Sequence, residues 1–438
     1  GALAQRPGAS VDHLDLTLSP NMTHLSGKEE VRYTNRENVP LAEIVFRLFP
    51  NLLGGSVTVS NLTLNGQPIA PVYSLLDSAM SVPLSAPLSP GEQAVLAMEF
   101  AVTVPTTEEV NYASFAYLDG IAALAHVYPI IAVYDDEGWN AEIPPTYGDV
   151  VYADSSFYLA RVTAPADQVL VGSGVEIETE TGSGTQTVTF AAGPMRDFYL
   201  AASNHYQRLS RTVGDSAINS YAPPEVSESA EIGLNYAVNA MQSFNARFGS
   251  YPFVELDLIA TPTLAGGIEY PGVIVVALSL YKDRGTFFEG ATAHEVAHQW
   301  FYSVVGNDQL DDPWLDEALT QYATWLYYRD MYGQQGDDGF REGMESRWQR
   351  LNRADIPIGL PVSGYDEREY GSIVYGRGPL FFDDLAGVMG QEAMDSFLRD
   401  YYRTNQWGIA TPENLKQLAE KACECDLTPA FEAAVYKK

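Results

Sequence analysis

The sequence predicts an α+β protein with two domains, an all-β domain over residues 1–205 and a mainly helical domain over residues 206–438. In the first stretch, hydrophobic residues alternate with polar ones and Gly, Pro and Asn recur at short intervals, which is typical of strands joined by turns. In the second stretch, hydrophobic residues recur at helical spacing. A chain of 438 residues, 46% of them hydrophobic, provides a sizeable core for each domain.

The alternation is clear near the start of the first domain, where Leu14, Leu16 and Leu18 are separated by polar residues. Asn65-Gly66 is a two-residue hairpin signal, and another turn signal follows at residues 182–184. This spacing predicts an all-β domain. Taken alone, this half of the chain is typical of a carrier or interaction module without chemistry of its own.

The second domain is expected to start with a helix, because hydrophobic residues follow one helical stripe between Pro223-Pro224 and Phe248-Gly249. Two apolar runs, residues 256–260 and 273–278, suit strands. Gly266-Gly267 lies between these runs. Because glycine lets a backbone approach a ligand closely, a peptide could bind along this edge by strand addition.

The run His-Glu-Val-Ala-His over residues 294–298 is the strongest chemical signal in the chain. Histidines four residues apart on a helix share one face, so His294 and His298 can bind a single ion through neutral imidazole nitrogens. Glu295 points about a quarter of a turn away from that face, so it borders the ion without being a ligand. It is therefore a candidate general base that holds a water molecule.

The flanking residues predict two consecutive helices. Thr286-Phe287-Phe288-Glu289 fits a capping box before the first, and Gly306-Asn307 is expected to end it. Asp312-Pro313 fits the N-cap and first residue of the second helix, which carries Glu317 in its first two turns. A reversal of chain direction between the two helices is expected to bring the carboxylate of Glu317 close to the two histidines. Three protein ligands with one open position are typical of a catalytic zinc site.

Three motifs in the same order resemble the aminopeptidase N family of gluzincin zinc metallopeptidases. Residues 294–301, His-Glu-Val-Ala-His-Gln-Trp-Phe, are followed at the family's spacing by Trp314-Leu315-Asp316-Glu317. Gly266-Gly267-Ile268-Glu269-Tyr270 resembles the Gly-x-Met-Glu-Asn exopeptidase motif, and Tyr375-Gly376-Arg377-Gly378 resembles the Tyr-x-Lys-Gly segment. Their agreement disfavours the simpler alternative, a chance match on a surface helix.

The resemblance implies a thermolysin-like, mainly helical catalytic domain after the β domain. It also implies a zinc-dependent aminopeptidase that hydrolyses N-terminal residues from peptides. In this reading His294, His298 and Glu317 bind Zn²⁺. Glu295 takes a proton from the attacking water and delivers one to the leaving amine.

The same resemblance assigns substrate-binding roles. It implies that Tyr375 hydrogen-bonds the oxyanion of the tetrahedral intermediate. A carboxylate at the blind end of a peptide groove pairs with an α-ammonium, so Glu269 is expected to anchor the substrate amine. Gly266 and Gly267 are expected to contact the peptide backbone.

Four departures from the family pattern stand out. Tyr270 stands where the family has Asn, and Arg377 where it has Lys, which keeps the charge but not the shape. Residues 117–125 contain no counterpart of the glutamine that helps to hold the substrate amine. Nothing in the sequence corresponds to the large C-terminal helical domain of the family, so we expect a more open cleft.

The last part of the chain predicts further helices. Residues 325–353 are expected to mix helix and loop, and helices are expected at 378–389 and 391–404. Thr411-Pro412 and Thr428-Pro429 each provide an N-cap and a first-turn proline for another helix.

Two other functions remain open at this level. A thermolysin-type endopeptidase would use the same metal ligands but cleave peptides with blocked N-termini. A non-catalytic binding protein with a relict zinc site belongs to a different class, and the presence of ligands, base and phenol together disfavours it.

The formal net charge of −32 argues against nucleic acid or an anionic membrane surface as a partner, since phosphate binders need a basic patch. An acidic protein instead favours peptides that carry a free cationic amine. No apolar run reaches the roughly 18 residues that a transmembrane segment needs.

The only cysteines, Cys423 and Cys425, are two residues apart and are expected to be free thiols. The chain opens with Gly1 rather than Met, which is consistent with removal of an export signal or anchor. We therefore favour an extracytoplasmic or cell-surface location over a cytoplasmic one.

Overall fold

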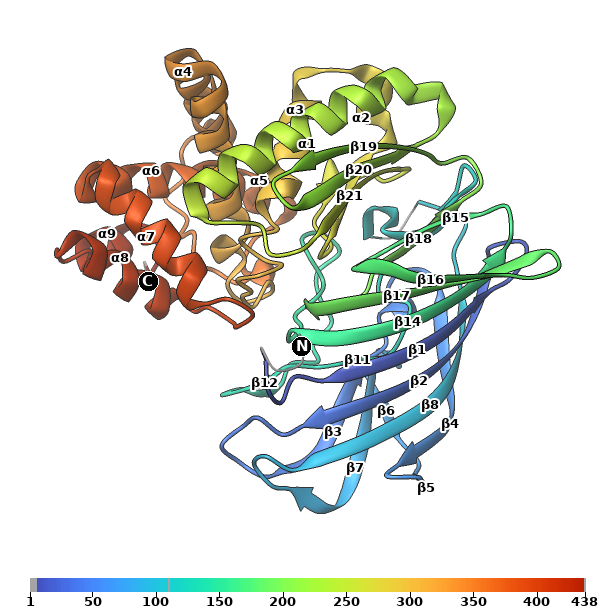
Figure 1. Ribbon diagram of the computed structural model, residues 1–438. Helices are drawn as coiled ribbons and strands as arrows, with labels where there is room; N and C mark the ends of the chain where they lie inside the picture. The colour runs from blue at the N-terminus through green and yellow to red at the C-terminus, as the bar shows by residue number, and fades with distance from the viewer. Residues whose placement is uncertain (1–5, 109–110, 437–438) are drawn as a thin grey trace.

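The computed structural model describes residues 6–108 and 111–436, and it confirms the expected α+β fold. Figure 1 shows the strands of the first half of the chain on one side of the molecule and the helices of the second half on the other. We place the boundary between the domains in the turn after Ser203, because the strand that follows joins a different sheet.

An eight-stranded sheet forms the body of the first domain, in the order β16-β17-β14-β1-β2-β8-β4-β5. Leu14, Leu16 and Leu18 are buried, as their alternation predicted. The strands are β1 (Val11–Leu18), β2 (His24–Thr34), β4 (Ser56–Leu64), β5 (Gln67–Pro68), β8 (Gln93–Thr103), β14 (Ser156–Pro165), β16 (Val175–Thr181) and β17 (Thr185–Met195).

Two four-stranded sheets, β15-β18-β10-β9 and β11-β3-β7-β6, and a short hairpin accompany the large sheet. Phe46, Phe100 and Phe198 come from different strands and loops but belong to one apolar core. The strands are β3 (Leu41–Arg47), β6 (Val72–Ser74), β7 (Ala79–Leu88), β9 (Phe115–Leu118), β10 (Ile121–Leu124), β11 (Ile130–Ile131), β12 (Tyr134–Asp135), β13 (Gly138–Trp139), β15 (Val169–Gly172) and β18 (Leu200–Ser203).

A five-stranded sheet, in the order β19-β20-β21-β23-β22, opens the second domain. Strands β21 and β23 are parallel, whereas β22 pairs antiparallel with β23 and forms the edge of the sheet. Helix α1 (Ser227–Phe248) packs against β19 and β20. The strands are β19 (Gln207–Val213), β20 (Ser216–Ala222), β21 (Glu255–Thr261), β22 (Gly267–Ile268) and β23 (Val273–Ala277).

Helices make up most of the remaining chain, and those expected at residues 378–389 and 391–404 are confirmed. The side chain of Thr411 accepts a hydrogen bond from the amide of Asn414, so this predicted N-cap is also confirmed. Thr428 instead lies inside its helix. The helices are α2 (Leu278–Asp283), α3 (Thr286–Ala297), α4 (Glu317–Gln349), α5 (Glu367–Ser372), α6 (Gly378–Met389), α7 (Gln391–Thr404), α8 (Pro412–Cys423) and α9 (Thr428–Ala434).

The predicted capping box before α3 is wrong. Thr286 is the first helical residue and Gly285 is the N-cap, without a capping side chain. Glu289 instead accepts hydrogen bonds from the hydroxyls of Tyr327 and Tyr332 at 2.7 Å. The carboxylate of Glu289 therefore bonds to tyrosines of α4 and does not cap α3 as the local sequence had predicted.

The expected helix boundaries around Glu317 are also wrong. Helix α3 ends at Ala297 rather than at Gly306-Asn307, since the chain then folds into tight turns. Residues 313–315 form only a short 3-10 turn. Helix α4 is longer than the expected mixture of helix and loop, and a non-helical Gly333 (φ 60°, ψ −141°) interrupts it.

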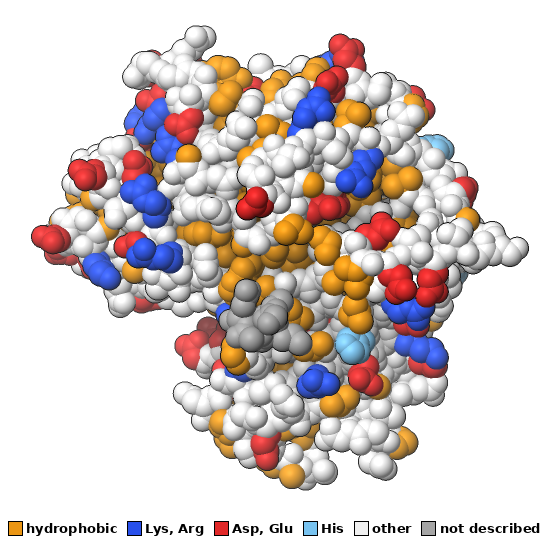
Figure 2. Space-filling view, viewed as in Figure 1, with side chains coloured by type: hydrophobic (Ala, Val, Ile, Leu, Met, Phe, Trp, Pro, Cys, Tyr) orange, Lys and Arg blue, Asp and Glu red, His pale blue; other side chains and the backbone are white. Residues whose placement is uncertain are grey.

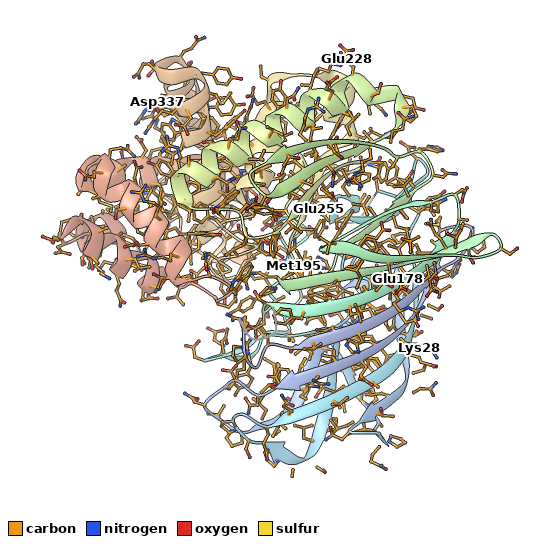
Figure 3. All side chains as sticks on the ribbon, viewed as in Figure 1. Lys28, Glu178, Met195, Glu228, Glu255 and Asp337 are labelled. Carbon is orange, nitrogen blue, oxygen red and sulfur yellow. A yellow bond between two sulfur atoms is a disulfide. The ribbon has the colours of Figure 1, made fainter. Side chains whose placement is uncertain are left out.

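A buried arginine ties the two domains together. Arg196 is 1% exposed and donates hydrogen bonds to the carbonyls of Ala153 at 3.0 Å and Tyr302 at 2.6 Å. Burial lowers the pKa of Arg196 to about 10. The neighbouring Met195, labelled in Figure 3, packs against Gly272 of the second domain. The second domain therefore packs directly against the first.

Cys423 and Cys425 form a disulfide, so the expectation of free thiols is wrong. Glu424 between them is left-handed (φ 52°, ψ 37°), and the two Cα atoms lie 5.2 Å apart, within the range that a disulfide requires. Of the helices described, none has the length and apolar character of a membrane span. On the face shown in Figure 2, Lys and Arg side chains are scattered among acidic ones.

Candidate active site

Helix α3 carries both histidines of the predicted metal site. The amide N–H of His298 donates to the carbonyl of His294 at 3.2 Å, which keeps the two rings one helical turn apart. Their Nε2 atoms are 3.0 Å from each other. Glu317 begins α4, and its Oε2 lies 3.0 Å from Nε2 of His294 and 3.4 Å from Nε2 of His298. The three predicted ligands therefore converge on one point.

The triangle of ligand atoms is within a few tenths of an ångström of one face of a zinc tetrahedron. Bonds of about 2.0–2.2 Å to a tetrahedral ion separate neighbouring ligand atoms by roughly 3.3–3.6 Å. The contacts here are 3.0, 3.0 and 3.4 Å. Two imidazoles and one carboxylate are also a typical donor set for a zinc ion that keeps a position for water or substrate. The residues fit zinc in both respects.

Asp316 and the backbone orient the ring of His298. Oδ1 of Asp316 lies 2.7 Å and the carbonyl oxygen of Phe301 3.1 Å from Nδ1 of His298. Because both are acceptors, Nδ1 carries the proton and Nε2 keeps its lone pair for the metal. Sequence reasoning missed this role of Asp316, although its position directly before Glu317 was a usable signal.

Glu295 is buried beside the metal site and packs against strand β22. A Cβ atom added to Gly267 would lie 2.3 Å from Oε1 of Glu295, so only glycine allows this approach. The other carboxylate oxygen, Oε2, is buried without a hydrogen-bond partner among the described residues. Burial raises the pKa of Glu295 well above its ordinary value, as expected for a proton-transfer group.

Glu269 lies at the end of the edge strand and is 5% exposed. Gln309 donates from Nε2 to Oε1 of Glu269 at 3.0 Å and to Oδ2 of Asp316 at 2.6 Å, so one amide links the two carboxylates. Burial raises the pKa of Glu269 to about 7. Gln309 was not foreseen from the sequence, and no motif points to it.

Asp149 brings a carboxylate from the first domain into the site. Oxygen atoms of Asp149, Glu269 and Glu317 lie within 4.8 Å of one another. Burial raises the pKa of Asp149 well above its usual range, and the charge of Glu269 adds to this effect. The sequence alone did not indicate Asp149 as a site residue, and the loop that carries it belongs to the other domain.

Tyr375 lies on a single π-helical turn, η7 (Ile373–Arg377), between α5 and α6. Its ring centroid is 6.0 Å from that of His294. Burial raises the pKa of Tyr375 well above its usual value, so the phenol stays protonated and can donate a hydrogen bond. Arg377 instead pairs with Asp355 at 2.9 Å.

A cavity of about 1100 Å³ contains these groups. Its walls come from β22, α3, α4 and η7 of the second domain and from loops of the first. The cavity brings together all side chains and glycines that the sequence singled out, namely Gly266, Gly267, Glu269, His294, Glu295, His298, Glu317 and Tyr375.

Comparison with known proteins agrees with this arrangement. Residues 232–433 match the peptidase family M1 domain. Aminopeptidase 2 of Candida albicans is 24% identical over 306 residues, which cover 66% of this chain and 33% of its own. Aminopeptidase N of Acetobacter pasteurianus is 29% identical over 181 residues, or 38% of this chain and 50% of its own. The chain thus spans about a third to a half of the length of these relatives.

Solved structures share the fold over nearly the whole chain. The M1 zinc metallopeptidase from Deinococcus radiodurans has a TM-score of 0.71 at 21% identity, covering 98% of this chain and 95% of its own. A variant of that protein bound to a Tyr-Ser-Ala substrate has a TM-score of 0.69 at 21% identity, with 97% and 93% coverage. Both domains of the chain therefore have counterparts in one solved fold.

Proposed function

We propose that the protein is a zinc-dependent aminopeptidase that removes N-terminal residues from peptides, on the premise that residues 232–433 match the peptidase family M1 domain. One observation carries the proposal. Nitrogen atoms of His294 and His298 and an oxygen atom of Glu317 converge with separations of 3.0 to 3.4 Å, next to the buried Glu295.

The proposed mechanism divides the chemistry among three groups. A zinc ion held by His294, His298 and Glu317 would supply Lewis acidity and would lower the pKa of a water molecule beside it. Glu295 accepts a proton from the attacking water and delivers one to the leaving amine. The hydroxyl of Tyr375 donates a hydrogen bond to the oxyanion that develops on the scissile carbonyl.

We propose that Glu269 and Asp149 together bind the α-ammonium of the substrate. Their carboxylates lie within 4.8 Å of each other, close enough for one ammonium group to contact both. Asp149 would then act in place of the amine-binding glutamine that residues 117–125 lack. An anchored amine leaves no room for further residues before it, which favours an aminopeptidase over a thermolysin-type endopeptidase.

Hydrolysis assays test this function directly. We expect the zinc-loaded protein to release N-terminal residues from unblocked peptides, to lose this activity with a chelator and to regain it with zinc. Peptides with acetylated N-termini are the matched control. Equal rates on free and acetylated peptides would favour the endopeptidase, and no hydrolysis of either would favour the non-catalytic binding protein.

We also propose an extracytoplasmic or cell-surface location. The disulfide between Cys423 and Cys425 supports it, because structural disulfides persist in oxidising compartments. Protein purified from its native compartment without reductant should contain no titratable thiol after unfolding. Two free thiols per chain would contradict the proposal.

A further inference from the structure

Arg347 is a cation in the active-site cavity without an acidic partner. It lies on α4, lines the cavity and is partly buried. Arg329 and Arg341 on the same helix pair with Asp337 and Asp383. Arg347 forms no ion pair with any carboxylate in the described part of the chain. In a protein of net charge −32, an arginine that lines a cavity without a salt bridge can pair with a carboxylate of a ligand.

Arg347 lies close to the proposed catalytic groups. Its guanidinium carbon lies 5.9 Å from the centroid of the Tyr375 ring. The backbone of α4 approaches η7 so closely that a Cβ on Gly376 would lie 2.9 Å from Cβ of Arg347. Arg350, directly after the last residue of α4, lines the same cavity and adds a second positive charge.

The cavity thus holds groups of opposite charge. Glu269 and Asp149 provide carboxylates, whereas Arg347 and Arg350 provide guanidinium groups. A short free peptide has the complementary pattern, with an ammonium at one end and a carboxylate at the other. An extended dipeptide spans at most roughly 7 Å and a tripeptide about 10 Å, so both fit within a cavity of about 1100 Å³.

We propose that Arg347, assisted by Arg350, binds the C-terminal carboxylate of dipeptide or tripeptide substrates. The inference rests on the proposed aminopeptidase function and narrows its substrate class to short peptides with a free C-terminus. A guanidinium group is suited to this role because its planar fork of N–H donors matches a carboxylate. Longer peptides would place their carboxylate beyond reach and gain nothing from Arg347.

The test compares zinc-loaded enzyme on Leu-Gly and Leu-Gly-Gly with the same peptides amidated at the C-terminus. We expect kcat/KM to be about tenfold or more higher for the free acids, mainly through a lower KM. A hexapeptide should show no such difference between its acid and amide forms. Equal kcat/KM for free and amidated short peptides would overturn the inference while leaving the aminopeptidase function intact. Failure to hydrolyse any of these peptides would count against the aminopeptidase itself.

Arg347→Gln should reduce the preference for free acids over amides to about one, because it removes the charge but keeps polar bulk. Arg347→Lys should keep part of the preference for free acids, because lysine keeps the positive charge but lacks the planar pair of N–H donors of a guanidinium group. The matched control is Arg399→Gln, which removes an exposed arginine on α7 outside the cavity and should keep the full preference. An unchanged preference in Arg347→Gln would exclude Arg347 as the carboxylate ligand.

A binding measurement separates recognition from turnover. Titration calorimetry of Leu-Gly and its amide into zinc-loaded Glu295→Gln protein reports affinity without cleavage. We expect the free acid to bind about tenfold more tightly, and the difference to vanish when Arg347→Gln is added. Equal affinities in the presence of Arg347 would contradict the proposal even if the kinetic preference were observed.

Discussion

Oδ1 of Asp316 lies 2.7 Å from Nδ1 of His298, on the opposite edge of the ring from the nitrogen that faces Glu317 at 3.4 Å. Asp316 and Glu317 are adjacent in sequence but have different roles. Glu317 points at the proposed metal position, whereas Asp316 contacts the opposite edge of the His298 ring. The carboxylate of Asp316 therefore sets the tautomer of the imidazole and raises its basicity.

Asp316→Asn should weaken zinc binding by about 10- to 100-fold, because an amide orients the ring without stabilising positive charge on it. Competition with a chromogenic chelator measures this affinity. Asp311→Asn is the matched control, since Asp311 is exposed on the same loop. Wild-type affinity in Asp316→Asn would show that the contact does not tune the metal site.

Glu295→Gln should lower kcat by about 10² to 10⁴ while zinc stays bound at one ion per chain, since Glu295 moves protons but is not a ligand. Steady-state kinetics and metal analysis of the same sample provide the two readings. Near-normal turnover would remove Glu295 from the mechanism, and loss of zinc would make it a ligand.

Gly267→Ala should reduce kcat by on the order of 10², because the new Cβ would lie 2.3 Å from Oε1 of Glu295 and displace it. Gly266→Ala is the comparison. Its Cβ would lie 2.9 Å from the ring of Phe287, which is 52% exposed and can turn away. Gly266→Ala should therefore lose less activity, and the reverse order would contradict the packing argument.

Glu269→Gln should abolish most of the preference for free over N-acetylated peptides by raising KM for the free peptides, since it removes a charge that pairs with the ammonium. Asp149→Asn should also reduce the preference for free over N-acetylated peptides. Kinetics with matched free and acetylated substrates measure both effects. If only Glu269→Gln changes the preference, Asp149 has no part in binding the amine.

The first domain should become less stable as the pH rises, because Asp12 and Glu29 face its core and are 6% and 2% exposed. Burial raises the pKa of Asp12 to about 8 and that of Glu29 well above its usual range. In the unfolded chain both groups ionise near pH 4. Between about pH 4 and 8 the unfolded chain therefore binds fewer protons than the folded protein, and the free energy of unfolding falls.

The double variant Asp12→Asn/Glu29→Gln isolates this effect. From pH 5 to pH 8, the wild-type free energy of unfolding in urea should fall by on the order of 2 kcal/mol more than that of the variant. Parallel pH profiles for the two proteins would show that these carboxylates are not buried in their neutral forms.

Much of the architecture could be predicted from local patterns. The alternation around Leu14, the helices over residues 378–389 and 391–404, and the metal-binding run at 294–298 depend on short-range periodicity, which the sequence displays directly. Helix boundaries were less predictable. Thr286 and Glu289 have capping chemistry, but the hydroxyls of Tyr327 and Tyr332 compete for the carboxylate.

The sequence by itself determined the chemical types present: two imidazoles at helical spacing, a following carboxylate, and a paired-glycine edge. Only the tertiary structure decided which other residues complete the site. Asp149 comes from the other domain, Gln309 from a loop without a motif, and Arg347 from a helix that packs closely against Gly376. These groups come together only when distant segments pack against each other, and local sequence patterns do not predict such contacts.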